Sequence, residues 1–193
     1  MDKDRLAAFS DGVIAIIITI MVLELKIPQG KQWGDLQPLL PQFLSYALSF
    51  LYVGIYWNNH HHMLQTVERV NGAILWANTN LLFWLSLIPF ATAWLGENQL
   101  AVVPTAFYGI ILLFPAVAYV ILQKCIIRSQ GPDSLLAKAI GNDFKGKVSA
   151  IFYVAGISWA FIHPLAADAI YALVAALWLV PDPRIEKMLG EKQ

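Results

Sequence analysis

The sequence has few charged residues and a single cysteine, Cys125. One cysteine supports neither a disulfide framework nor a cysteine metal cluster. Thirteen basic and 13 acidic residues give a formal net charge of zero, so no charge excess indicates nucleic acid as a partner. Charged residues make up only 13% of the chain, against roughly 25% in soluble domains, which argues against a soluble enzyme.

Hydrophobic residues, by contrast, make up 58% of the 193 residues and are gathered into long runs. A helix of about 20 apolar residues crosses a hydrocarbon core roughly 30 Å thick. We therefore predict an all-α integral membrane protein, a single unit over residues 1–193 with six transmembrane helices. The expected spans are 5–25, 38–62, 74–95, 100–127, 148–163 and 165–180.

Two prolines and the N-terminal segment affect the expected shape of these spans. Residues 148–180 are too long for one crossing, so we expect a helical hairpin at Pro164 and a solvated Asp168 after it. Pro89 is expected to kink the third span. The N-terminal span has no small-residue cleavage pattern, so we expect it to be retained.

The basic residues predict the orientation of these spans. With both termini in the cytoplasm, 11 of the 13 lysines and arginines lie inside, and only Lys26 and Lys31 lie outside. Basic residues near span ends are retained on the cytoplasmic side. We expect a multi-pass protein of the cell membrane with both termini cytoplasmic.

The first span, in "RLAAFSDGVIAIIITIMVLEL", carries polar residues among apolar ones. At 100° per residue, an aliphatic stripe about 80° wide runs through Phe9, Val13, Ile16, Ile20 and Leu23. Asp11 lies roughly 140° away from Ile16. The stripe therefore faces lipid or another aliphatic surface, and the face that carries Ser10 and Asp11 turns toward other helices.

A second polar cluster, "YWNNHHHM", ends the second span. In the predicted topology it reaches the same depth as Ser10 and Asp11, and the third span brings Asn78 and Asn80 there too. We expect one buried hydrogen-bond network in which Ser10 and Asp11 hold the first helix through His60 or His61. Three consecutive histidines point about 100° apart and cannot all face one ion, so no bound structural metal is expected.

These residues resemble a known family. The segment "RLAAFSDGVIAI", with Thr19 and the following "LEL", is similar to the RxxxFSD signature of the transmembrane protein 175 family of potassium channels. "YWNNHHHM" resembles its Trp-x-x-His-His pattern, and "LLFWLSLIPF" resembles its third helix. The matching motif residues are Arg5, Phe9, Ser10, Asp11, Trp57, His60 and His61.

The resemblance implies a channel selective for potassium over sodium, with one six-helix repeat per chain and four chains around a central pore. It implies that the first helix lines the pore, with Ile16, Ile20 and Leu23 as the aliphatic constriction and Thr19 on the pore side. The expected partners are further copies of the chain, the lipid bilayer and permeant potassium ions near Ile16 and Thr19. No cofactor is implied.

Such a pore works without the carbonyl filter of other potassium channels, and the sequence contains no TVGYG loop and no arginine ladder. A ring of Ile16 side chains forms an apolar neck that gates by dewetting. Ions must shed water to cross it, which potassium does more easily than sodium. Glu24 at the outer mouth either concentrates cations or lies at the lipid interface.

The residues alone leave three other functions open. A secondary transporter would show internal repeats or helices broken at midplane, and spans one to three do not visibly repeat in spans four to six. A membrane enzyme needs a catalytic constellation at one depth, for which the histidine cluster is the one candidate. A non-conducting helical membrane protein is excluded only by the family resemblance.

Overall fold

The structure is a computed structural model that describes residues 2–98, 101–141 and 143–179, and in these residues the regular structure is entirely helical. This confirms the all-α part of the predicted fold class. The elements are α1 (Lys3–Leu23), η1 (Trp33–Leu39), α2 (Leu40–Gln65), α3 (Gly72–Ser86), α4 (Ile88–Glu97), α5 (Val102–Gln130), α6 (Leu135–Ile140), α7 (Phe144–Ala160) and α8 (Pro164–Leu179).

Local sequence signals fix where several of these helices begin and end. Asn71 caps α3, because its side chain accepts a hydrogen bond from the backbone N–H of Ile74 at 3.0 Å. Pro164 is the first residue of α8, where its missing N–H costs nothing. Gly131 ends α5 with a φ of 91°, a conformation that glycine adopts without strain.

Pro89 divides the predicted third span into two helices. α3 ends at Ser86 and α4 begins at Ile88, so the helix is interrupted at Leu87. The proline ring would collide with the carbonyl of Leu85, four residues earlier, and Pro89 has no N–H to donate. By contrast, α5 continues as one helix through Pro115.

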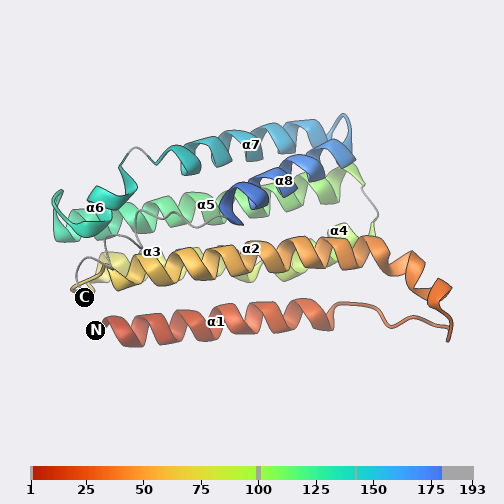
Figure 1. The fold of residues 1–193 in the computed structure, drawn as a ribbon, viewed down its shortest axis with the longest axis horizontal. Helices are drawn as coiled ribbons and strands as arrows, with labels where there is room; N and C mark the ends of the chain where they lie inside the picture. The colour runs from red at the N-terminus through yellow and green to blue at the C-terminus, as the bar shows by residue number, and fades with distance from the viewer. Residues whose placement is uncertain (1, 99–100, 142, 180–193) are drawn as a thin grey trace.

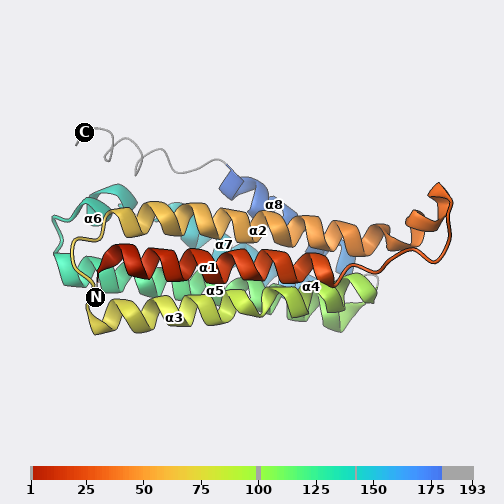
Figure 2. The same cartoon turned by 90° about the horizontal axis from the view of Figure 1, so that it is seen from below.

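The long helices run alternately in opposite directions, side by side (Figures 1 and 2). α5 lies in the middle of the bundle, between α3 and the pair formed by α7 and α8. α1 lies along one edge and packs mainly against α2, α3 and α4. Because α1 has neighbours on one side only among the described residues, its other side is left uncovered by this part of the chain.

Among the described residues, four helical stretches are long and apolar enough to cross a membrane: 3–23, 33–65, 72–97 and 102–130. They coincide with the first four predicted spans. The predicted hairpin also exists as two helices, with α7 ending at Ala160 and α8 beginning at Pro164. The described parts of these two helices have 17 and 16 residues, close to the lower limit of about 17 residues for a crossing.

Buried glycines allow close packing where α5, α7 and α8 meet. Tyr171 of α8 is fully buried against Gly109 of α5 and Gly156 of α7. A Cβ atom at either glycine would overlap the tyrosine ring. The small residues therefore create the space that this ring fills.

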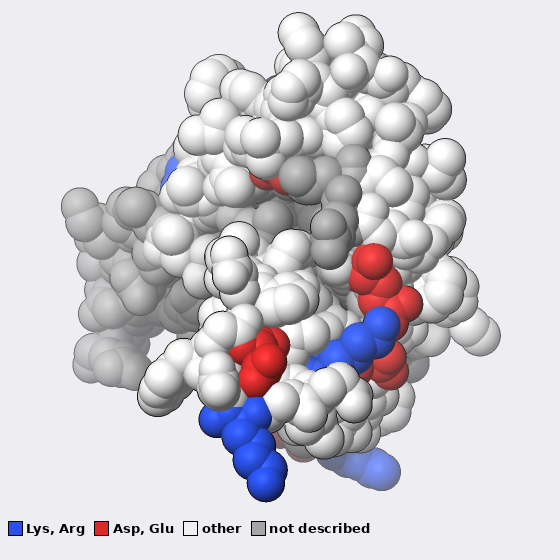
Figure 3. Space-filling model, turned by 90° about the vertical axis from the view of Figure 1, so that its right-hand side faces the viewer, with Lys and Arg blue, Asp and Glu red and all other residues white. Residues whose placement is uncertain are grey.

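The end of the bundle where α1 finishes carries charges of both signs. Figure 3 shows this end, on which acidic and basic side chains gather over one part and leave the remainder largely uncharged. The ion pair that the described residues form lies here, between Lys26 and Glu97 at 3.0 Å.

Candidate functional site on helix α1

Helix α1 has one face turned to the bundle and one face left open. The buried residues recur every three or four positions and are Leu6, Ser10, Ile14, Ile17 and Met21. On the opposite side, Ile16, Ile20 and Leu23 are 58%, 42% and 80% exposed. The three residues predicted for a constriction thus share a face that the rest of the described chain leaves exposed.

The open face is not purely apolar. Thr19 is exposed there, and its hydroxyl donates a hydrogen bond to the carbonyl of Ile16 at 2.9 Å. This bond uses the only hydroxyl proton, so the oxygen keeps acceptor capacity for a group approaching from outside. Thr19 can therefore offer an oxygen ligand one turn from Ile16.

Helix α4 forms a wall beside the open face. A groove between the two helices is lined by Ile16, Ile20 and Glu24 of α1 and by residues of α4 that include Phe90 and Ala93. Val13, which sequence periodicity assigned to the aliphatic stripe, lines this groove too but is partly buried against the core. It is therefore the least exposed residue of the stripe.

Ser10 is fastened to the bundle by a buried chain of hydrogen bonds. Asn78 of α3 donates its amide N–H to the Ser10 hydroxyl at 2.9 Å, and its carbonyl oxygen lies 2.7 Å from Nε2 of His60. All three residues are fully buried. The structure thus brings together three of the predicted network residues, with Asn78 as the link between Ser10 and His60.

Asp11 has a different partner from the one expected. Its carboxylate accepts a hydrogen bond at 2.9 Å from the indole N–H of Trp57, not from a histidine. His61 instead lies 2.8 Å from the side-chain amide of Gln65, and its ring lies beside that of Trp57. Asp11 is one residue beyond Ser10 and hence about 100° around α1, which directs it toward the more exposed side of α2.

The other two motif residues lie outside this network. Arg5 is exposed at the first turn of α1 and forms no ion pair within the described part of the chain. Phe9 is 60% exposed and belongs to the open face. The motif residues therefore divide between the two faces of the helix.

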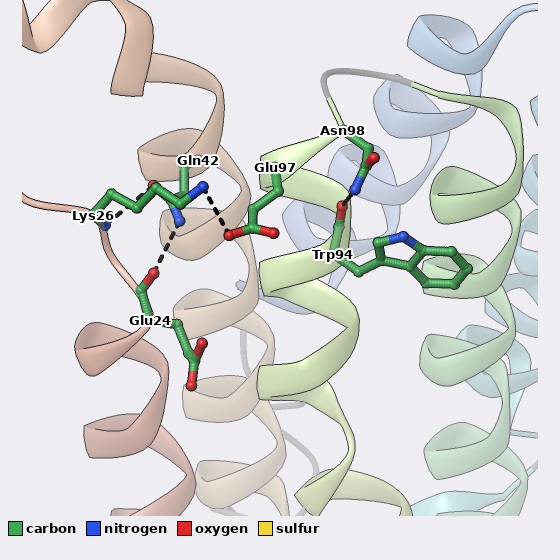
Figure 4. Close-up of polar contacts among 6 residues, drawn as sticks. All are labelled: Glu24, Lys26, Gln42, Trp94, Glu97 and Asn98. Carbon is green, nitrogen blue, oxygen red and sulfur yellow. Dashed lines mark hydrogen bonds and ion pairs between the residues drawn. The ribbon is translucent and has the colours of Figure 1, made fainter.

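The sequence interpretation missed a set of contacts that hold the other end of α1. The side-chain amide of Gln42 donates to the carbonyl of Glu24 at 2.9 Å and accepts from the N–H of Lys26 at 3.2 Å (Figure 4). The Lys26 ammonium in turn pairs with Glu97 at the end of α4. Gln42, a polar residue within the apolar stretch 38–62, was the sequence signal for this contact.

Asp168 also differs from its prediction. It was expected to be solvated, yet the side chain is only partly exposed. Its Oδ1 atom is enclosed and has no hydrogen-bond partner among the described residues. The packing of α8 into the bundle, close after the break at Pro164, accounts for this enclosure.

Comparisons with known proteins identify the family. Residues 5–89 match the family model described as endosomal/lysosomal potassium channel TMEM175. A potassium channel of Chryseobacterium sp. is 60% identical over 191 residues, which cover 99% of this chain and 100% of the relative. A potassium channel of Streptomyces collinus is 31% identical over 201 residues, covering 96% of this chain and 97% of that protein.

A solved structure agrees with this assignment. The crystal structure of a lysosomal potassium-selective channel TMEM175 homolog from Chamaesiphon minutus superimposes with a TM-score of 0.80 and 28% sequence identity. The match covers 93% of this chain and 97% of that one. The match to the family model and the full-length similarity to bacterial relatives together show that the chain belongs to the TMEM175 family.

Proposed function

We propose that the chain is the subunit of a potassium channel whose pore is lined by α1. The observation that carries this proposal is the open face of α1, on which Ile16, Ile20 and Leu23 remain exposed after the chain has folded. The bacterial relatives of full length are named potassium channels, and the similar solved structure is that of a potassium-selective channel.

The polar residues on the same face favour a pore over lipid. Thr19 and Glu24 are both exposed beside the aliphatic side chains. A face in contact with lipid tails would hold the Glu24 carboxylate near hydrocarbon without a partner, at a cost of several kcal/mol, whereas the Thr19 hydroxyl already bonds to the carbonyl of Ile16. A water-filled pore solvates both side chains where it is wide enough to hold water.

Four copies of Ile16 around the axis form the neck of the pore, and Ile20 and Leu23 form further apolar layers. A neck of this kind resists wetting, and an ion in it loses part of its hydration shell. Potassium loses water at a lower cost than sodium, and the Thr19 oxygens replace some of what is lost. The result is a moderate preference for potassium without a carbonyl filter.

The proposed assembly is a homotetramer in the cell membrane. Helices α7 and α8 complete the six crossings; at 1.5 Å per residue their described parts are each roughly 25 Å long, and local bilayer thinning accommodates the remainder. An even number of crossings leaves both termini on one side of the membrane, and the distribution of lysine and arginine makes that side the cytoplasm. On this arrangement the network of Ser10, Asn78 and His60 lies at the cytoplasmic end and Gln42 at the outer end.

Reconstitution into a planar bilayer under a KCl gradient tests the proposal. A channel gives unitary currents that reverse near the potassium equilibrium potential. Saturable potassium uptake by proteoliposomes without unitary currents would identify a transporter instead. Neither current nor uptake from a protein that is correctly assembled would identify a non-conducting membrane protein.

A further inference from the structure

We propose that Gln42 is a positioning residue that fixes the Glu24 carboxylate at the outer mouth of the pore. This inference rests on the proposed function. It adds a residue that controls how readily cations enter the pore at its outer end. It is carried by the contacts of one buried side chain with the end of α1.

Gln42 binds the backbone on both sides of Leu25. Its amide nitrogen donates to the carbonyl of Glu24, and its amide oxygen accepts from the N–H of Lys26 (Figure 4). Both groups lie just past the last residue of α1, where no helical partner remains for them. The direction in which the chain leaves α1 is therefore set by one side chain from α2.

The support behind Gln42 is rigid. The side chain is only 7% exposed, in the first turn of α2. Gly96 of α4 lies against it so closely that a Cβ there would be 2.8 Å from the Gln42 Cα. Helices α2 and α4 thus meet almost backbone to backbone at this level, which prevents Gln42 from shifting.

The Lys26–Glu97 ion pair leaves Glu24 unneutralised. The nearest basic side chain in sequence, that of Lys26, points to Glu97 on α4, and Figure 4 shows the Glu24 carboxylate apart from this pair. Glu24 is exposed and lines the groove that also contains Ile20 and Phe90. A free carboxylate therefore stands at the outer end of the stripe that we assign to the pore.

Four such carboxylates around an axis form a negative ring at the mouth. A ring of this kind raises the local cation concentration, most strongly at low ionic strength. The effect depends on where each carboxylate lies relative to the axis. Without Gln42, the carbonyl of Glu24 and the N–H of Lys26 lose their partner, the turn relaxes and the carboxylates leave their common ring.

The test compares single-channel conductance in Gln42→Met, Glu24→Gln and the double variant. Methionine keeps the volume beside Gly96 but removes both hydrogen bonds. In about 0.01 M KCl, where the Debye length is about 30 Å, each single variant is expected to lower inward conductance about twofold. At about 1 M KCl the loss should disappear, because screening removes the benefit of the ring.

The double variant separates a positioning role from a purely structural one. If Gln42 acts through Glu24, the double variant conducts as poorly as Glu24→Gln alone and no worse. Additive losses, or normal low-salt conductance in Gln42→Met, would overturn the proposal. Gln37→Met, at an exposed position on η1, is the matched control and should conduct as the wild type does.

A substitute variant and a recording of the wild type distinguish failure of the positioning role from failure of the proposed function. Should Gln42→Met fail to assemble by size-exclusion chromatography, Gln42→Leu takes its place, since it also removes both hydrogen bonds and adds no charge at the mouth. Normal low-salt conductance in that variant would equally overturn the positioning role. Absence of unitary currents from the wild type would instead overturn the proposed function itself.

Discussion

The indole N–H of Trp57 donates a hydrogen bond to the carboxylate of Asp11 at 2.9 Å, and this bond joins the last third of α2 to the first half of α1. It lies beside the buried link from Ser10 through Asn78 to His60. α1 is thus held at this level by one partly exposed contact and one buried contact. The two should respond differently to substitution.

Trp57→Phe should weaken the attachment of α1 modestly. The substitution removes the donor to Asp11 and keeps an aromatic ring near His61. Hydrogen bonds to charged groups contribute about 1.5–3 kcal/mol, and the partial exposure of Trp57 places the expected loss at the lower end. Thermal unfolding in detergent measures it, with Trp76→Phe, at a 76% exposed position, as the unaffected control.

Asn78→Leu should be more damaging, because it removes a bond to the buried Ser10 hydroxyl and leaves Nε2 of the fully buried His60 without a partner. The unsatisfied group on His60 costs about 1–3 kcal/mol, whereas the Ser10 hydroxyl keeps its bond to the carbonyl of Leu6. Detergent size-exclusion chromatography after graded heating would show the loss of assembled protein. Asn80→Leu on the same helix, at a partly exposed position, should cost much less; equal losses in the two variants would argue against the network.

Ile16→Asn should wet the proposed neck. Polar side chains in a ring lower the barrier to water, so single-channel conductance should rise and the preference for potassium over sodium should fall. Ile151→Asn on α7 is the matched control, because Ile151 is 68% exposed but lies away from α1. Unchanged conductance and selectivity in Ile16→Asn would show that the pore is lined elsewhere.

Gly156→Ala should destabilise the packing of α7 on α8. The added methyl group would overlap the ring of Tyr171, and overpacking of this kind costs about 1–3 kcal/mol. Gly54→Ala on α2 has open space around it and should stabilise the protein by up to about 1 kcal/mol. Opposite signs in the two thermal shifts would support the tight contact, and a stabilised Gly156→Ala would refute it.

Asp168→Asn should leave stability unchanged or raise it. The enclosed Oδ1 has no donor among the described residues, and an unpaired charge in an apolar setting is costly, whereas a neutral amide of the same shape is less so. Asp133→Asn, in the exposed turn after α5, should have no effect on thermal stability. A clear loss of stability in Asp168→Asn would mean that the carboxylate is neutralised by a bound cation.

Much of the fold follows from the sequence alone. Long apolar runs predict membrane helices because unpaired backbone groups cannot remain in hydrocarbon, and Pro89 and Pro164 lie where helices must break. The 3.6-residue period also separates the face with Ser10 from the face with Ile16 on α1. These properties depend on residues close together in the chain.

The tertiary structure decided the rest. Periodicity cannot show which side of α1 the other helices cover, or that Ser10 is linked to His60 through Asn78. The partner of Asp11 proved to be Trp57, and Gln42 proved to hold the end of α1. Such choices depend on distances between side chains far apart in sequence, which are fixed only when the helices pack, because several donors of similar chemistry compete for each acceptor.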